Sequence, residues 1–176
     1  MQLEIDFLAP RDDPGRARLP IRLRAGTNRR RNVEAVLHGD HILVTHPPRM
    51  SRAEAERIGE ELRVRLERRS ACDEIDLAAR AAILAARHGL PMASSIAWSE
   101  RQQSQWGVCM TATAEIRISG RLAELPRFVL DYVIVHELAH LEHPDHGPAF
   151  HALVGRYPRA ERAIGYLMAL DHHRRE

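Results

Sequence analysis

Cysteine is scarce in this chain, which has only Cys72 and Cys109. Two thiols are too few for a disulfide framework or a thiolate zinc site. Long hydrophobic runs are also missing, because charged residues interrupt them well short of the roughly 20 residues that a membrane span requires. The first residues, Met1-Gln2-Leu3-Glu4-Ile5-Asp6, are too acidic for a signal peptide. We therefore expect a cytoplasmic protein without a membrane segment, in which any metal has ligands other than cysteine.

Lysine is absent, so all 26 basic residues are arginines, and against 24 acidic residues they give a net charge of +2. The charge is uneven, since no acid lies between Asp13 and Glu34 although seven arginines do: Arg16, Arg18, Arg22, Arg24, Arg29, Arg30 and Arg31. The guanidinium fork matches phosphate, so this Arg16–Arg31 stretch could bind a nucleic acid or a nucleotide. Arginines that alternate with Ile21 and Leu23 also fit the solvated face of an ordinary strand, which we favour.

The length of 176 residues, with 44% hydrophobic and 28% charged residues, fits a single globular domain over residues 1–176. Its first part, residues 1–50, is expected to be rich in strands, because residues 3–7 and 19–24 alternate apolar and polar side chains. Residues 33–37 and 42–45 flank His38-Gly39-Asp40-His41, which suits the turn of a β-hairpin. Three histidines surround this hairpin, but no helical spacing holds them together, so we favour exposed histidines over a metal site at His38, His41 and His46.

Residues 51–90 are expected to form two helices. Ser51 and Glu54 have the spacing of a capping box, and apolar residues at helical spacing continue to about residue 69. Residues 70–73 are the expected linker, and a second, alanine-rich helix is predicted over 73–88, closed by Gly89.

Residues 95–170 combine strands and helices. Residues 96–98, 106–110 and 115–119 predict a three-strand meander. Pro126 suits a helix start, and an apolar helix should run from there to about Glu142, before Pro144. A short helix over 148–157 and a helical tail over 159–170 are expected to follow.

The segment from His136 to His140 has the arrangement H-E-x-x-H, which is the strongest signal in the sequence. Four residues are just over one helical turn, so both imidazoles project from the same face and can bind one cation. Glu137 is rotated by about 100° around the helix, where a carboxylate can accept a proton from an activated water. The flanking residues are almost all apolar, and burying these groups without partners is costly. We therefore favour a metal site over core histidines paired to carboxylates.

A catalytic zinc ion usually has three protein ligands and one open position. His143 would lie about ten ångströms along the helix from His136, too far for easy joint chelation. His146 belongs to a turn between Pro144 and Gly147-Pro148 that could bring its imidazole back, and its six-residue spacing from His140 equals that of the third metzincin histidine. We rank His146 first, His151 second and His143 third.

The segment from about Trp98 to Leu170 resembles the YgjP-like metallopeptidases, relatives of the SprT-like zinc proteases. These carry W-G-S-C, a helix ending in H-E-L-x-H and a later H-x-x-x-F element; the corresponding stretches here are residues 105–109, 131–140 and 146–150. The resemblance implies an α+β fold with a zincin-like core, in which a small antiparallel sheet packs on the H-E-x-x-H helix after an N-terminal β-hairpin region. It also implies that His136, His140 and His146 hold zinc and that Glu137 is the general base.

This chain departs from the family pattern next to the expected site. Gln105 replaces the usual basic residue, Val108 the serine, and His151 the tryptophan after the phenylalanine. The metal ligands are intact, so these changes bear on substrate preference. The resemblance further implies a peptide or protein substrate lying along residues 115–119 by edge addition. Arg156, Tyr157 and Tyr166 are downstream candidates for an oxyanion stabiliser, but a tyrosine in a helical tail is more often packing.

Two other functions compete with peptide hydrolysis. One is a metal-dependent nucleoside triphosphate pyrophosphatase, an activity described for some YgjP-like proteins, in which arginines would clamp phosphates. The other is a nucleic-acid-associated module with a structural zinc, which would need a fourth ligand such as His143 or His151. We favour the zinc metallopeptidase.

Overall fold

The computed structural model describes residues 18–26, 32–102 and 104–173, which fall into two compact units: one up to Ala71 and one from Cys72 onward. Each unit is described by itself. That the whole chain forms one domain stays a prediction. Within the described residues, no helix has both the length and the apolar character needed to cross a membrane.

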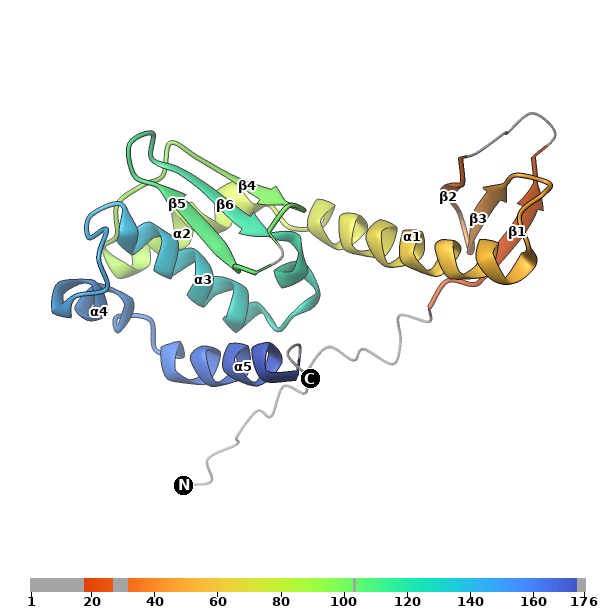
Figure 1. Cartoon of the computed structure of the whole chain (residues 1–176). Helices are drawn as coiled ribbons and strands as arrows, with labels where there is room; N and C mark the ends of the chain where they lie inside the picture. Colours follow the sequence, from red (N-terminus) through yellow and green to blue (C-terminus); the bar gives the residue numbers. More distant parts are fainter. Residues whose placement is uncertain (1–17, 27–31, 103, 174–176) are drawn as a thin grey trace, which may run out of the picture. The chain divides into compact units, whose positions relative to one another are not determined.

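The first unit holds a mixed three-stranded sheet and most of one helix (Figure 1). The strands are β1 (Ile21–Ala25), β2 (Glu34–His38) and β3 (His41–His46). β3 is central, antiparallel to β2 and parallel to β1. The β2–β3 pair confirms the predicted hairpin, whose turn contains Gly39 with φ of 52°, a conformation that glycine adopts without strain. The strand expected at residues 3–7 lies outside the described residues.

Helix α1 (Arg52–Asp73) begins where the capping pattern predicts but ends later. The backbone N–H of Glu54 donates to Oγ of Ser51 at 3.2 Å, while the Glu54 carboxylate pairs with Arg57 instead of reaching back. The predicted linker over residues 70–73 is wrong, because these residues continue the helix. Their helical state has a packing reason: Ala71 and Cys72 are buried, so the last turn contributes to a core.

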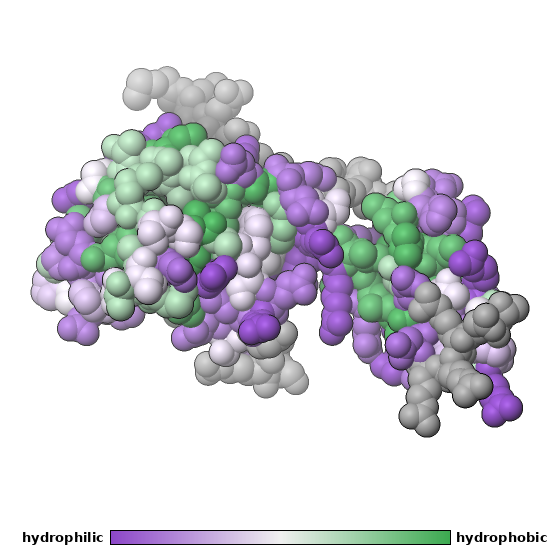
Figure 2. Space-filling view, turned by 90° about the horizontal axis from the view of Figure 1, so that it is seen from above, coloured by the Kyte–Doolittle hydropathy of each residue, from purple (hydrophilic) through white to green (hydrophobic). Residues whose placement is uncertain are grey.

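The start of α1 covers one face of the β1–β3–β2 sheet. Ile42 and Val44 of β3 are fully buried, and a Cβ at Gly59 of α1 would lie 3.2 Å from Cγ2 of Val44, so helix and strand approach closely. Apolar surface remains in this unit (Figure 2), where Val36 and Leu37 of β2 are among the exposed large hydrophobic residues.

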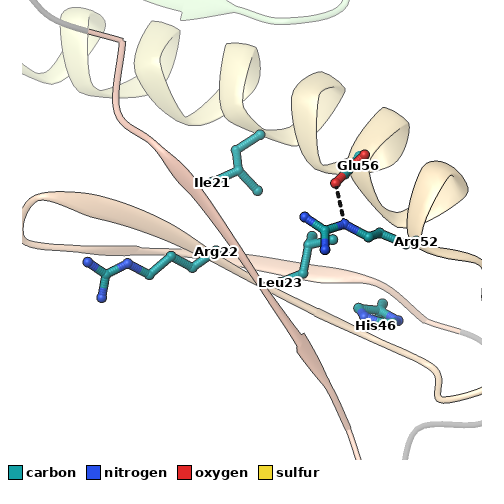
Figure 3. Close-up of a pocket in the computed structure, with 6 residues that line it drawn as sticks. All are labelled: Ile21, Arg22, Leu23, His46, Arg52 and Glu56. Carbon is teal, nitrogen blue, oxygen red and sulfur yellow. Dashed lines mark hydrogen bonds and ion pairs between the residues drawn. The ribbon is translucent and has the colours of Figure 1, made fainter.

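An open hollow of about 740 Å³ lies beside β1 and the start of α1 (Figure 3). Three of its polar side chains have partners: Arg52 donates to Glu56 at 2.8 Å, and Nδ1 of His46 lies 2.9 Å from the carbonyl oxygen of Pro47. The lining residues are Ile21, Arg22, Leu23, His46, Arg52 and Glu56.

The second unit combines four helices of the described chain with a second mixed sheet. Its helices are α2 (Leu77–His88), α3 (Arg127–His140), α4 (Pro148–Val154) and α5 (Ala160–His173), and a 3-10 turn, η1, covers Gly120–Glu124. Its strands are β4 (Ser95–Ser99), β5 (Gly107–Met110) and β6 (Glu115–Ser119). The α+β prediction is confirmed, with the sheets mixed rather than antiparallel.

The strand order of this sheet is β4–β6–β5, with β6 parallel to β4 and antiparallel to β5. The predicted meander, in which β5 would lie between its neighbours in sequence, is therefore wrong. The reason is burial: Ile116 and Ile118 of β6 are both 0% exposed, so the strand with the most deeply buried side chains takes the central position.

Helix α2 starts at Leu77 because Asp76 caps it, accepting a hydrogen bond from the N–H of Ala79 at 2.9 Å. The start predicted at residue 73 is wrong because α1 continues to that residue. The predicted end is confirmed, since Gly89 closes the helix with φ of 61°.

Helix α3 lies at the centre of the second unit, between the sheet and α5, and also contacts α2 and α4 (Figure 1). Pro126 is its N-cap, so the helix starts one residue after the predicted start, and it ends at His140, two residues before the predicted end. Arg80 of α2 donates to Oδ2 of Asp131 at 2.6 Å, and this pair joins α2 to α3. The core around α3 therefore fixes the helix that carries the H-E-x-x-H motif.

Candidate metal centre

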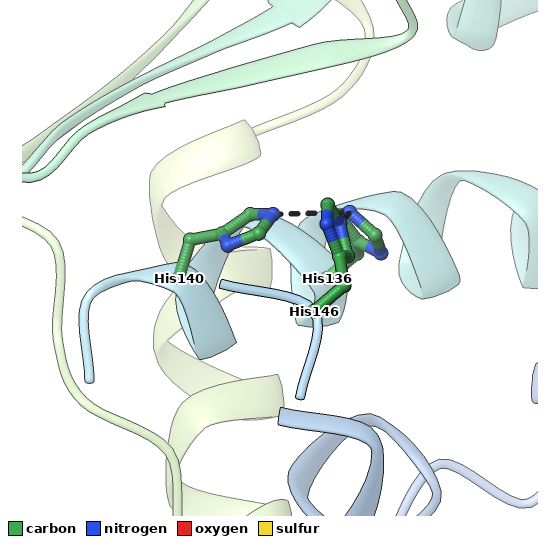
Figure 4. Close-up of side chains that lie close together, drawn as sticks. All are labelled: His136, His140 and His146. Atoms are coloured by element: carbon green, nitrogen blue, oxygen red, sulfur yellow. Dashed lines mark hydrogen bonds between the residues drawn. The ribbon is translucent and has the colours of Figure 1, made fainter. Parts of the chain in front are cut away.

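Three imidazoles converge at the C-terminal end of α3 (Figure 4). Nε2 of His136 lies 3.2 Å from Nε2 of His140 and 3.3 Å from Nε2 of His146. His136 and His140 come from successive turns of α3, as their spacing predicts, and His146 comes from the loop that follows. Their potential ligand atoms all lie within 4.8 Å of one another, which is the arrangement of a three-histidine metal site.

The loop after α3 brings His146 back because the helix stops at His140. The N–H of His143 donates to the carbonyl of Ala139 at 2.9 Å, and Pro148 begins α4 after Gly147. Nδ1 of His140 lies 3.1 Å from the carbonyl oxygen of His143. A carbonyl can only accept, so the proton of neutral His140 sits on Nδ1 and its Nε2 lone pair points into the cluster.

Phe150 of α4 forms an apolar wall against the three histidines. Its ring centroid lies 4.9 Å from that of His136, 4.5 Å from that of His140 and 4.7 Å from that of His146. The side chain is 1% exposed. Phe150 therefore limits the positions that the three imidazoles can adopt, which preorganises their lone pairs.

The imidazoles of α3 are held in their neutral form. Burial, followed by the neighbouring histidines, lowers the pKa of His136 to about 4. Burial also lowers the pKa of His140. Neutral imidazoles are the ligand form. Nε2 of His136 faces Nε2 of His140 at 3.2 Å and Nε2 of His146 at 3.3 Å, so the three ring nitrogens are close enough to share one cation. A divalent cation that accepts three Nε2 lone pairs fits this donor set.

The other candidate histidines lie outside the cluster. Nε2 of His143 is 3.8 Å from Oε1 of Glu142, and the ring of His151 packs edge-on against Phe150 at 5.6 Å. In the first unit, His38 and His41 stack at 5.8 Å without forming a metal-binding group within the described chain. Of the three residues ranked as third ligand, the structure thus brings only His146 to His136 and His140.

Glu137 lies beside the cluster and faces strand β5. Its side chain is 6% exposed, and burial raises the pKa of its carboxyl to about 7. A Cβ at Gly107 would lie 2.5 Å from Oε1 of Glu137, so the carboxylate occupies the space that this glycine leaves open. A carboxyl with this pKa can take up and release a proton near neutral pH.

Strand β5 is anchored at its start by Trp106. The indole Nε1 donates to Oδ2 of Asp171 in α5 at 3.2 Å, and the guanidinium of Arg121 lies 4.0 Å from the ring centroid. Arg121 also donates to the carbonyl of Gln105 at 2.9 Å. β5 is an edge strand of its sheet, whereas β6 is central. The expectation that residues 115–119 offer a free edge for substrate is therefore wrong, and β5 is the edge strand next to Glu137.

Comparison with known proteins agrees with this geometry. The model of the YgjP-like family, metallopeptidase domain, matches residues 51–163, which is more than half of the chain. The chain belongs to this family. The matched range contains the three histidines and Glu137 and leaves strands β1 to β3 outside it. No curated protein and no solved structure matches significantly.

The three residues considered as oxyanion stabilisers have packing roles in this YgjP-like domain. Arg156 donates to the carbonyls of His88 and Gly89 at 3.0 and 2.9 Å. The hydroxyl of Tyr157 is buried and donates to the carbonyl of Phe128 at 3.1 Å, and Tyr166 packs edge-on against the ring of Phe128.

Tyr132 lies next to the histidine cluster, and sequence reasoning missed it. Its ring centroid lies 6.0 Å from that of His136, one turn later on α3. Burial raises the pKa of Tyr132, and the negative charges of Glu161 and Glu137 raise it further. The signal that could have revealed it is its spacing, four residues before His136, which puts both residues on one helix face.

Only part of the arginine-rich stretch can be located. Arg18, Arg22 and Arg24 are exposed, and Arg24 donates to Oγ1 of Thr45 at 3.4 Å on the neighbouring strand. Arg16 and residues 29–31 lie outside the described residues. Nucleotide or nucleic-acid binding by this stretch stays a prediction.

Proposed function

We propose that this protein is a zinc-dependent metallopeptidase that hydrolyses peptide bonds in a peptide or protein substrate. His136, His140 and His146 are the metal ligands, and Glu137 is the general base. The observation that carries the proposal is the convergence of three imidazole Nε2 atoms beside a buried carboxyl group whose pKa lies near 7.

The donor set supports zinc as the metal. Zinc favours nitrogen and sulfur ligands in tetrahedral sites, and a catalytic zinc has three protein ligands with a fourth position open. The three histidines supply the protein ligands, and no fourth histidine, cysteine or acidic residue of the described chain joins the cluster. When bound, the ion would lower the pKa of a water molecule and polarise the carbonyl group of the substrate.

Glu137 supplies the proton transfers. Its carboxylate accepts a proton from the attacking water and then donates it to the amine that leaves. A pKa near neutrality suits both steps, because the group must be ionised before the first transfer and protonated before the second. The absence of a side chain at Gly107 leaves the space that this carboxyl group occupies.

Strand β5 is the element that supports binding of an extended substrate. Its backbone is paired to β6 on one side only, so a peptide can add to the other side through main-chain hydrogen bonds. Because Gly107 of β5 contacts Glu137, a peptide paired to β5 would pass beside the general base. In this mode of binding, β5 would recognise the backbone of the substrate rather than one particular side chain.

The phosphohydrolase alternative has less support. Arginine clamps on phosphate need guanidinium groups directed at the reaction centre. Within the described chain, no hydrogen bond or ion pair joins an arginine to Glu137 or to the three histidines, and Arg156 is bonded to backbone carbonyls. A module with a structural zinc also has less support, since His143 and His151 lie outside the cluster.

The test compares two substrates on the zinc-loaded chain. Fluorescently labelled casein and a nucleoside triphosphate are offered to the wild type and to Glu137→Gln. We expect casein to be cut by the wild type only, with zinc retained in both proteins. Hydrolysis of the nucleotide alone, or casein cleavage that survives Glu137→Gln, would refute the proposal.

A further inference from the structure

One stripe of α3 is open to the surface. Every residue from Phe128 to His140 is buried except three, and these three lie at intervals of four residues: Tyr132, His136 and His140. Residues four apart on a helix are neighbours on one face. Two members of this stripe belong to the three-histidine cluster, so the third, Tyr132, lies on the same partly exposed face of α3.

The hydroxyl of Tyr132 is available for a ligand. No hydrogen bond to it forms within the described part of the chain, in contrast to the hydroxyl of Tyr157, which donates to the carbonyl of Phe128. The ring of Tyr132 is tilted by 56° to that of His136 at a centroid separation of 6.0 Å. This contact places the Tyr132 ring next to the first of the three histidines.

We propose that Tyr132 is a catalytic residue that donates a hydrogen bond from its hydroxyl to the carbonyl oxygen of the scissile peptide bond as negative charge develops there. This inference rests on the proposed peptidase function. Hydrogen-bond donors accelerate amide hydrolysis most when they are already fixed in position toward the oxygen that becomes negatively charged. Tyr132 meets this condition because it stands on a helix whose other faces are packed in the core.

A purely structural role for Tyr132 makes a different prediction. The ring packs partly against the core, and a Tyr132→Phe substitution keeps that ring while removing only the hydroxyl. If Tyr132 acts only through the packing of its ring, Tyr132→Phe should have the activity of the wild type. Tyr166→Phe is the matched control, because it also loses one hydroxyl from a ring that packs against the core of the same unit.

The experiment uses the full chain loaded with zinc, with zinc content and melting temperature measured for each protein. For Tyr132→Phe, we expect kcat on labelled casein to fall by about 10²-fold, the effect typical of losing one oxyanion donor, with KM changed less than about twofold. A phosphinic Phe–Ala pseudodipeptide, which mimics the tetrahedral transition state, should lose a similar factor in affinity. Zinc content and melting temperature should stay the same, and Tyr166→Phe should behave as the wild type.

The outcomes separate the two proposals. Wild-type kcat and inhibitor affinity in Tyr132→Phe would overturn the role of Tyr132 while leaving the peptidase intact. Equal losses in Tyr132→Phe and Tyr166→Phe would also overturn it, since the effect would then not depend on the stripe. A zinc-loaded wild type that neither cuts casein nor binds the phosphinic compound would overturn the proposed function and the role of Tyr132 with it.

Discussion

The carboxyl group of Glu137 fills the space in which a side chain at Gly107 would lie. A Cβ at this position would be 2.5 Å from Oε1 and 2.7 Å from Cγ of Glu137, closer than carbon and oxygen atoms approach without bonding. Helix α3 and strand β5 are both held by other contacts, so neither can simply move away. Glycine at residue 107 is therefore what allows Glu137 to reach its position beside the three histidines.

Gly107→Ala should displace Glu137 while leaving the metal ligands in place. We expect casein hydrolysis to fall by about 10²-fold, because a shift of about 1 Å in a catalytic group can cost that much. Zinc content should not change, since the three histidines come from α3 and its following loop. The control is Gly165→Ala, where a Cβ would meet no atom within 4 Å. Wild-type activity in Gly107→Ala would contradict this account of the contact.

The raised pKa of Glu137 predicts a pH dependence of stability in the metal-free protein. Its pKa is about 7 in the folded chain, against an ordinary value of 4.5. Between pH 4.5 and 7 the folded state therefore holds more protons than the unfolded state, and the free energy of unfolding falls as pH rises through this window. The Glu137→Gln variant has no carboxyl group to titrate, so it does not lose stability in this way. The free energy of unfolding of the variant minus that of the wild type should therefore be about 3 kcal/mol greater at pH 8 than at pH 4.

Denaturant unfolding in EDTA at pH 4 and pH 8 measures this difference. At pH 4 Glu137 is mostly protonated in both states, so the pair of proteins at that pH is the internal control. The lowered pKa of His136 acts in the opposite sense, since stability is lost as pH falls below 6.5, but it acts in both proteins and cancels. A stability difference that does not change with pH would show that Glu137 has an ordinary pKa.

The Arg80–Asp131 pair should be important for stability. It joins α2 to α3, and Asp131 is largely buried. Asp131→Ala leaves Arg80 without its partner, and we expect the free energy of unfolding to fall by about 3 kcal/mol. The control is Glu56→Ala, which breaks the exposed Arg52–Glu56 pair and should cost less than about 1 kcal/mol. Equal effects of the two substitutions in denaturant unfolding would contradict the prediction.

The features that could be predicted from the sequence are those set by nearby residues. The spacing of His136 and His140 on a helix, the left-handed cap at Gly89 and the β2–β3 hairpin each depend on a few consecutive residues, and all are present. The family resemblance, which rests on motifs of this local kind, is confirmed as well.

The features that could not be predicted depend on contacts between distant residues. Strands adjacent in sequence are usually neighbours in a sheet, so a meander was the natural expectation for β4, β5 and β6. Burial of Ile116 and Ile118 instead places β6 in the centre and leaves β5 at the edge beside Glu137. The space at Gly107 and the Tyr132 hydroxyl, which has no hydrogen bond within the described residues, likewise become visible only when α3 is packed in its unit.

Metal content tests the central claim most directly. Elemental analysis of the purified wild type, Glu137→Gln and His146→Ala should give one zinc per chain in the first two proteins and much less in the third. His151→Ala and His143→Ala, the matched histidine controls, should keep their zinc. Zinc lost from Glu137→Gln would make Glu137 a ligand rather than the base, and a wild type that binds no divalent metal would contradict the account as a whole.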